Sequence, residues 1–292
     1  MRSLYLTGYP TKLSIGPDGL RITNGKETTA TAPPYFPYDQ VVIQRADGYV
    51  SLRALRVLME QKVSIALLDY RGMLRGHFVP YARRGDGGLW LRQLTVASDP
   101  KKRLAIAKRI VSEAYERRST PFDGSRARTV AELVSMESRI GNANWLRWAE
   151  RLSERWPRHD FKGRSRPDYP TNLRAVSRVN AVLNYGYSLL EAAARVACHR
   201  VGLLPDVGFL HAPSPHKEPM VYDIQEYGRG WVDEAVLDWL SEPAHQKGYV
   251  RSEDWHYVLP AELARSLVAA VSPRIDGPQL LRDARTVVRA LA

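Results

Sequence analysis

The sequence predicts an α+β protein in which a β-strand-rich N-terminal domain, residues 1–84, precedes an all-helical C-terminal domain, residues 90–292. Three observations predict this order. Up to about Tyr81, short apolar runs alternate with turn residues, which is typical of strands. A Gly- and Arg-rich connection, "ARRGDGGLW", follows. From Leu91 onward apolar residues recur every three or four positions, which is the period of an α-helix.

The strands of the N-terminal domain are predicted from six runs: "LYL", "KLSIG", "GLRITNG", "QVVIQRADGYVS", "VSIALLD" and "GHFVPY". Gly-Pro-Asp-Gly, Asn-Gly and Asp-Gly sequences between or within them favour tight turns. One helix interrupts the strands, because Leu52, Leu55 and Leu58 follow helical spacing after Ser51, a favourable N-cap. The proline-rich stretch "TATAPPYFPYDQ" is expected to be a loop or a sheet edge.

The C-terminal domain begins with a basic tract. Between Lys101 and Arg128, nine basic residues stand against three acidic ones, which predicts a helix with a basic face that leads into a loop. A basic helix face of this kind is usually just exposed to solvent. Because the whole chain is basic, a face that binds phosphate groups is an alternative interpretation. Farther on, Val179–Ala197 predicts a buried core helix, because its polar and charged residues interrupt the roughly 20 apolar residues that a membrane span needs.

Composition narrows the possible functions. The 292 residues carry a net charge of +12, which favours a polyanionic partner, with nucleic acid ahead of an anionic membrane surface. The charge alone does not distinguish such a protein from a soluble basic protein without a polyanionic partner. The lone cysteine, Cys198, excludes an intramolecular disulfide and a cysteine-rich zinc site, and it is expected to be a core residue. The N-terminus lacks the pattern of a secretion signal, so a cytoplasmic protein without membrane association is expected.

Glu137 is the first candidate metal ligand. It lies in "AELVSMESRIGNANWLRW", where Leu133, Met136, Ile140 and Ala143 mark one helical face. Glu137 therefore points toward packed side chains, where an unpaired carboxylate is costly. Pairing with a buried arginine explains such a residue equally well.

His211, Asp223 and Glu226 are further candidates. His211 ends the apolar run "VGFLH", while Asp223 and Glu226 follow Pro219, which is suited to the first turn of a helix. Their i, i+3 spacing places both carboxylates on one face of that helix. Taken by itself, His211 could simply be a packed core residue. Taken by themselves, the two acids could simply be favoured by the helix dipole near a helix N-terminus. Together with Glu137, these residue types suit Mn²⁺ or Mg²⁺ better than zinc, because no second histidine or cysteine lies in range.

Four blocks of sequence resemble the CRISPR adaptation integrase family, the metal-dependent CRISPR-associated endonucleases that insert new spacers into a CRISPR array. These blocks are "MESRIGNANWLRW", "SRVNAVLNYGYSLLEAAAR", "VGLLPDVGFLHAP" and "MVYDIQEYGR". The end of the β-rich domain, "YVSLRALRVLMEQKVSIALLDYRGMLRGHFVP", is also similar to that family. The likeness extends over most of the chain, to roughly residue 270. The order of the blocks is more specific than any one of them.

The resemblance implies roles for the candidate residues. Glu137, His211 and Glu226 become the ligands of Mn²⁺ or Mg²⁺, and Asp223 a nearby essential carboxylate. The implied reaction is transesterification, in which 3′-hydroxyls of a short DNA duplex attack phosphodiesters at the repeat boundaries of the array. The resemblance further implies a homodimer formed through the β domain and a complex with a small ferredoxin-like partner protein. Double-stranded DNA, as both prespacer and CRISPR repeat, is the implied substrate.

Several basic residues are candidates for contacts with DNA phosphates. Four precede or begin the central helix and one follows His211: Arg164, Arg166, Arg174, Arg178 and Lys217. Near these sites the chain departs from the family, with Gly141 and Asn144 in place of alanine and tyrosine, and "YG" in place of Pro-Phe after Glu226. Glu218 also adds a negative charge beside Lys217.

Two other functions remain open at the level of sequence. The same ligands suit a metal-dependent nuclease that cleaves branched DNA without integrating it. A catalytically silent, DNA-binding architectural subunit is the third candidate, favoured by the altered residues around Lys217 and Glu226.

Overall fold

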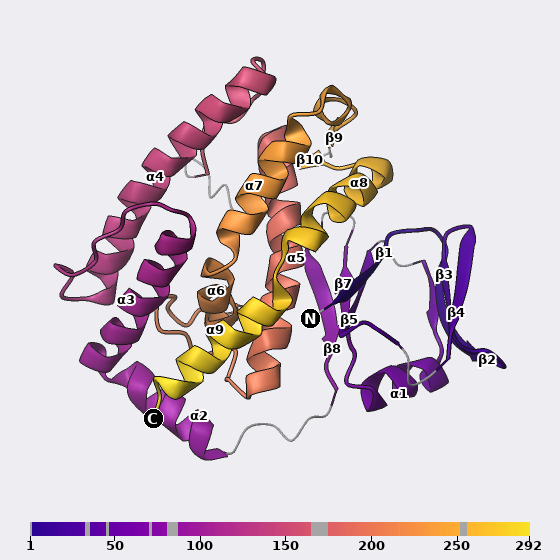
Figure 1. Ribbon diagram of the computed structural model, residues 1–292, viewed down its shortest axis with the longest axis horizontal. Coiled ribbons are helices and arrows are strands. Elements are labelled where there is room, and N and C mark those ends of the chain that lie inside the picture. Colours follow the sequence, from indigo (N-terminus) through magenta and orange to yellow (C-terminus); the bar gives the residue numbers. More distant parts are fainter. Residues whose placement is uncertain are drawn as a thin grey trace.

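A computed structural model describes residues 2–32, 36–44, 47–69, 72–80, 87–164, 175–215, 217–251 and 256–292 of the chain (Figure 1). Two sheets gather at one end of the molecule and nearly all the helices at the other, which agrees with the predicted α+β class. The expected junction near residues 82–89 lies largely outside the described residues. The strands of the two sheets end at Phe78, and the first helix of the second part begins at Gly87.

Eight short strands form the two N-terminal sheets: β1 (Ser3–Leu6), β2 (Thr11–Gly16), β3 (Gly19–Asn24), β4 (Glu27–Thr31), β5 (Gln40–Gln44), β6 (Gly48–Val50), β7 (Ser64–Leu68) and β8 (Leu74–Phe78). One sheet has the order β4-β3-β2-β6 and the other β1-β5-β7-β8. In the second sheet β1, β5 and β7 are parallel, and β8 is antiparallel to β7. The proline-rich stretch was expected to be a loop or an edge, and its first residues lie in β4, an edge strand.

Local sequence explains how these strands are connected. Gly19 has a φ of 105°, which allows the tight turn between β2 and β3. The predicted helix is α1 (Leu52–Glu60), and Ser51 caps it by accepting a hydrogen bond from the Ala54 backbone N–H at 3.1 Å.

The C-terminal part contains eight α-helices in the described residues: α2 (Gly87–Ser98), α3 (Pro100–Arg117), α4 (Val130–Arg155), α5 (Arg178–Val201), α6 (Pro219–Glu226), α7 (Arg229–Leu240), α8 (Ala261–Val271) and α9 (Gly277–Arg289). Two 3₁₀ turns accompany them, η1 (Pro243–Gln246) and η2 (Ser272–Arg274). The expectation of an all-helical domain is wrong in one detail. Two short strands, β9 (Val250–Arg251) and β10 (Tyr257–Val258), pair antiparallel, and two-residue strands are too short to leave a period in the sequence.

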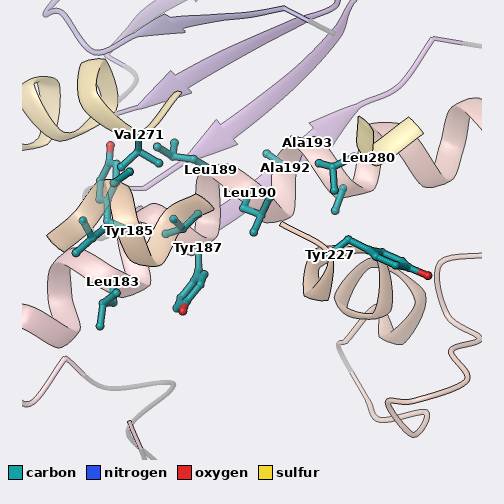
Figure 2. Packing of buried hydrophobic residues seen from close by; sticks show 14 of the residues in the cluster. Leu183, Tyr185, Tyr187, Leu189, Leu190, Ala192, Ala193, Tyr227, Val271 and Leu280 are labelled. Carbon is teal, nitrogen blue, oxygen red and sulfur yellow. The ribbon is translucent and has the colours of Figure 1, made fainter. Parts of the chain in front are cut away.

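Helix α5 is the centre of the core. It is buried along nearly its whole length, as the sequence predicts, and it packs against α6, α7, α8 and α9 (Figures 1 and 2). Cys198 is fully buried within it, which confirms the expected core role. Tyr185 and Tyr187 are also buried on this helix. No helix in the described ranges has the length and apolarity required to cross a membrane.

The β1-β5-β7-β8 sheet packs directly on the helical part. Val42, Ala66 and Leu68 from its strands belong to the same apolar cluster as the α5 side chains. Two polar contacts cross the junction: the Gln40 side chain donates to the Ala192 carbonyl at 3.3 Å, and Arg200 pairs with Asp39 at 2.8 Å. The sheet and the helices therefore hold α5 in a fixed position, and α5 in turn supports the candidate site.

Candidate metal and phosphate site

Asp223 organises the loop that carries His211. Helix α6 begins at Pro219, as predicted, and places Asp223 beneath this loop with no exposed surface. Its Oδ2 accepts the backbone N–H groups of Phe209 and Leu210 at 2.5 and 3.1 Å, and its Oδ1 accepts that of His211 at 3.0 Å. Asp223 is therefore a positioning residue whose two oxygens are both occupied.

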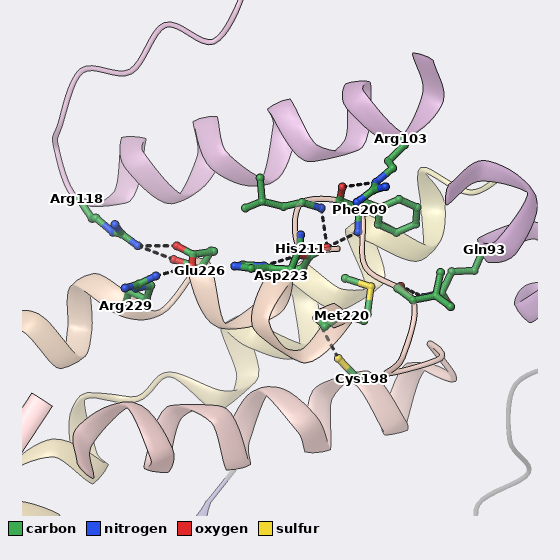
Figure 3. Close-up of polar contacts among 12 residues, drawn as sticks. Gln93, Arg103, Arg118, Cys198, Phe209, His211, Met220, Asp223, Glu226 and Arg229 are labelled. Carbon is green, nitrogen blue, oxygen red and sulfur yellow. Dashed lines mark hydrogen bonds and ion pairs between the residues drawn. The ribbon is translucent and has the colours of Figure 1, made fainter. Parts of the chain in front are cut away.

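The His211 ring is fixed in one orientation by the same carboxylate. Its Nδ1 lies 2.8 Å from Asp223 Oδ1 and donates to it (Figure 3). In the neutral ring this leaves the lone pair of Nε2, which has no hydrogen-bond partner among the described residues, able to bind a metal. Burial lowers the pKa of His211, but the hydrogen bond and charge of Asp223, together with the charge of Glu226, outweigh burial and raise the pKa above its ordinary value. The side chain remains 39% exposed, so a ligand can reach it.

Glu226 ends α6 and faces two arginines (Figure 3). Arg229 Nη1 lies 2.7 Å from Glu226 Oε1, and Arg118 Nη2 lies 3.4 Å from Oε2 and 3.0 Å from the Glu226 carbonyl oxygen. Burial raises the pKa of Glu226, but Arg229 and Arg118 outweigh burial and lower the pKa to about 2. Glu226 is therefore ionised and paired.

Glu137 comes from α4 on the other side of these arginines. The Tyr115 hydroxyl on α3 donates to Glu137 Oε1 at 2.8 Å, and burial followed by the charge of Glu137 raises the pKa of Tyr115. The Arg118 guanidinium lies 5.2 Å from the centre of the Tyr115 ring. Leu133, Met136 and Ile140 pack as predicted, whereas Ala143 is exposed.

A pocket of about 590 Å³ opens beside Glu137, between α4 and the start of α7. Its basic lining consists of Arg117, Arg118, Arg147, Arg151, Arg229 and Arg274. Its acidic residues are Glu137, Asp233 and Glu234. Trp145 and Trp148 also line it, and Trp148 is buried with its indole N–H donating to the Asp233 carbonyl at 3.0 Å. Six guanidinium groups around an open pocket are suited to phosphate groups.

The donor types fit a divalent cation, but their placement does not form a complete site. Within the described ranges, no three histidine, cysteine, aspartate or glutamate side chains are grouped closely enough to hold a metal ion. His211 has a free nitrogen, whereas both Glu226 oxygens face arginines and Glu137 is bonded to Tyr115. Arg118 and Tyr115 thus stand between Glu226 and Glu137, and the predicted ligands do not converge on one point.

The predicted DNA-binding residues are dispersed. Arg164 is buried and donates to Asn180 Oδ1 at 2.8 Å, so it does not lie on the open surface. Arg178 pairs with Asp160 at 3.1 Å and stacks on Trp156, while Lys217 is exposed. The remaining two predictions, Arg166 and Arg174, lie outside the described residues.

Two residues that support the His211 loop were not found from the sequence. The buried side chain of Gln93 donates to the Leu204 and Val207 carbonyls at 3.0 and 2.6 Å. Arg103 Nε donates to the Phe209 carbonyl at 2.8 Å. A polar glutamine on a helix face has no local feature that identifies it as a loop support, and only the fold reveals it.

Comparison with known proteins agrees with this arrangement. A family model described as "CRISPR associated protein Cas1" matches residues 4–123 and 119–272.

The chain belongs to the Cas1 family.

Two relatives cover nearly the whole chain. The CRISPR-associated endonuclease Cas1 2 of Pyrobaculum aerophilum is 27% identical over 94% of this chain and 94% of its own length. The CRISPR-associated endonuclease Cas1 1 of Methanospirillum hungatei is 27% identical over 95% of this chain and 89% of its own. The resemblance predicted from the four sequence blocks is thus confirmed.

Solved structures share the Cas1 fold. A casposase bound to integration product superimposes with a TM-score of 0.84 at 24% identity, covering 100% of this chain and 90% of the other. A Cas1 protein from Thermotoga maritima gives 0.81 at 18% identity, covering 100% and 97%. A chain of a Cas6-RT-Cas1–Cas2 complex gives 0.76 at 18% identity, covering 99% of this chain and 34% of that one.

Proposed function

We propose that this Cas1-family protein is a metal-dependent DNA integrase that joins the 3′-hydroxyls of a short DNA duplex to a CRISPR array by transesterification. The observation that carries the proposal is the arrangement around Asp223. Asp223 orients the imidazole of His211, and the buried, ionised Glu226 pairs with Arg118 and Arg229. These two arginines line a pocket together with Glu137 and four further arginines. Two observations support it: the relatives are named endonucleases, and a structure of the same fold is a casposase bound to integration product.

Each residue has a distinct role in this proposal. His211, Glu226 and Glu137 would hold Mn²⁺ or Mg²⁺, and Asp223 would keep His211 Nε2 directed outward. The cation would supply Lewis-acid activation of a hydroxyl and charge stabilisation at the attacked phosphodiester. The pocket arginines would bind the DNA backbone and orient the phosphodiester for in-line attack, which requires no covalent bond to the protein.

The partners follow from the same reasoning. Double-stranded DNA, as prespacer and as CRISPR repeat, would lie against the basic pocket. A homodimer through the N-terminal sheets and a complex with a small ferredoxin-like partner are part of the proposal. The solved Cas1–Cas2 complex and a Cas1–DNA complex of the same fold support partners of this kind. The cytoplasm is the proposed compartment.

An integration assay tests the proposal. Purified protein is incubated with a labelled duplex bearing free 3′-hydroxyls and a supercoiled plasmid that carries a repeat array, with Mn²⁺, Mg²⁺ or EDTA. We expect label to join the plasmid only when a divalent cation is present. His211→Ala is expected to abolish joining. His159→Ala, which removes a histidine whose ring contacts Ser153 and the Phe161 N–H among the described residues, serves as the matched control.

Other results of this assay identify the alternatives. Cleavage of branched DNA without joining would support the structure-specific nuclease. DNA binding that persists in Glu137→Ala, with neither joining nor cleavage by the wild type even with a partner protein, would support the architectural subunit.

A further inference from the structure

Arg118 holds the carboxylate of Glu226 less firmly than Arg229 does. The Arg229–Glu226 distance is 2.7 Å, whereas Arg118 Nη2 lies 3.4 Å from the other carboxylate oxygen. The Nε of Arg118 is buried and has no hydrogen-bond partner among the described residues. A guanidinium with an unused donor beside a loosely held anion has more to gain from a second anion than one that is fully paired.

The neighbouring arginine shows the contrast. Arg117 forms two parallel hydrogen bonds with the buried Asp283 at 2.7 and 2.6 Å, which tie the end of α3 to α9. Arg118 follows it at the C-cap of the helix and bonds to Glu226 instead (Figure 3). Arg117 is thus held by a two-point ion pair, whereas Arg118 has a hydrogen-bond donor that is not used.

The surroundings of Arg118 leave it a route into the pocket. Its stem passes over Gly230, where a Cβ would lie 3.0 Å from Arg118 Cγ, and its guanidinium lies over the Tyr115 ring. Both Arg118 and Gly230 line the arginine-rich pocket. A rotation of this side chain would move its guanidinium away from the Glu226 carboxylate and toward the pocket.

We propose that Arg118 is a positioning residue that alternates between two anions: the Glu226 carboxylate in the metal-free protein and a DNA phosphate once a divalent cation has taken Glu226. The inference rests on the proposed function, because it assumes that Glu226 is a metal ligand. Arg118 and the cation then compete for one carboxylate. Because the displaced arginine gains a phosphate, cation binding and DNA binding strengthen each other through this residue.

Cation affinity measured without DNA tests the competition. Binding of Mn²⁺ is followed by the loss of its free EPR signal for the wild type, Arg118→Gln and Arg147→Gln. Arg147 lines the same pocket and contacts Asn144 at 3.4 Å, so its substitution removes an equal charge without touching Glu226. We expect Arg118→Gln to bind Mn²⁺ about three- to tenfold more tightly than the wild type, which corresponds to one modest ion pair, and Arg147→Gln to bind within about twofold.

DNA affinity provides the second half of the test. With a duplex whose 3′ ends are dideoxy-terminated and do not react, Arg118→Gln should bind about tenfold more weakly than the wild type in Mn²⁺ and about equally well in EDTA. Equal tightening of Mn²⁺ binding by both glutamine variants, or no tightening by Arg118→Gln, would overturn the inference. A DNA defect of the same size with and without Mn²⁺ would also overturn it.

Two further variants separate the causes of failure. Gly230→Ala keeps the arginine but crowds its stem, and it should also tighten Mn²⁺ binding, which guards against a folding defect in Arg118→Gln. His211→Ala reports on the metal site itself. If it binds Mn²⁺ as well as the wild type does, the proposed function fails at that point, whatever Arg118 does.

Discussion

Asp223 determines what His211 can do. A buried carboxylate that accepts three backbone N–H groups and an imidazole N–H fixes the loop, the ring and the protonated nitrogen together. The sequence predicted that Asp223 and Glu226 share a helix face, because Pro219 and the i, i+3 spacing are local features. It did not predict that Tyr115 would hold Glu137, because a contact between two helices depends on how they pack.

We expect the metal-free protein to show an elevated His211 pKa. NMR titration of the imidazole should give a value above the ordinary 6.5, because Asp223 and Glu226 outweigh burial. Protonated His211 therefore adds stability that is fully present below pH 6.5 and is lost as the pH rises through the folded pKa.

Asp223→Asn should lower the His211 pKa, because the amide keeps a hydrogen-bonding group and removes the charge. Asp206→Asn, an aspartate on the preceding loop, serves as the control. An unchanged imidazole pKa in Asp223→Asn would contradict this account.

At the scale of elements, glycines on two helices have opposite surroundings. A Cβ at Gly186 on α5 would lie 2.7 Å from Val232 Cγ1 on α7, so the missing side chain lets these helices approach. A Cβ at Gly141 on α4 would meet only Glu137 Oε1 at 3.5 Å and the Tyr115 hydroxyl at 3.6 Å. Close packing therefore requires a glycine at position 186 of α5, whereas α4 has room for a larger residue at position 141.

We expect Gly186→Ala to lower the free energy of unfolding by about 1–3 kcal/mol, because Val232 is branched and packed. Gly141→Ala should leave it unchanged or raise it by up to about 1 kcal/mol, through better helix propensity. Urea denaturation followed by circular dichroism measures both. Val232→Ala combined with Gly186→Ala should recover part of the loss if the contact is the cause. Destabilisation of equal size in both single variants would refute the distinction.

At the scale of the whole molecule, the sequence predicted the order of strands and helices better than it predicted how they meet. Strand β5, "QVVIQ", is buried throughout, and a run without alternation indicates a strand covered on both faces. Nothing in that run identifies α5 as the covering element. The β9–β10 pair was missed because so short a strand leaves no pattern.

The net charge of +12 leads to a prediction for DNA binding by the whole protein. If the arginine-rich pocket and nearby surface neutralise about five phosphates, the logarithm of the binding constant should fall with the logarithm of salt concentration with a slope of roughly −4.5. Fluorescence anisotropy of a labelled duplex over a series of NaCl concentrations measures this slope. Arg147→Gln should make it shallower by about 1. A slope near zero would exclude backbone binding as the main source of affinity.

Helix α4 links Glu137 and α3 to α7. Its far half is fastened to α7 by Trp148 and by the paired Arg151 and Glu234. Its near half packs on α3 through apolar side chains such as Leu133, and Tyr115 of α3 holds Glu137. Glu137 and Trp148 are eleven positions apart, or about 16 Å along a helix. A tilt of about 5° at the fastened end would displace the glutamate by about 1.4 Å over that length, a misplacement of the size that costs enzymes about two orders of magnitude in rate. A shift of α7 relative to α3 would therefore alter the position of Glu137 in the proposed site from a distance.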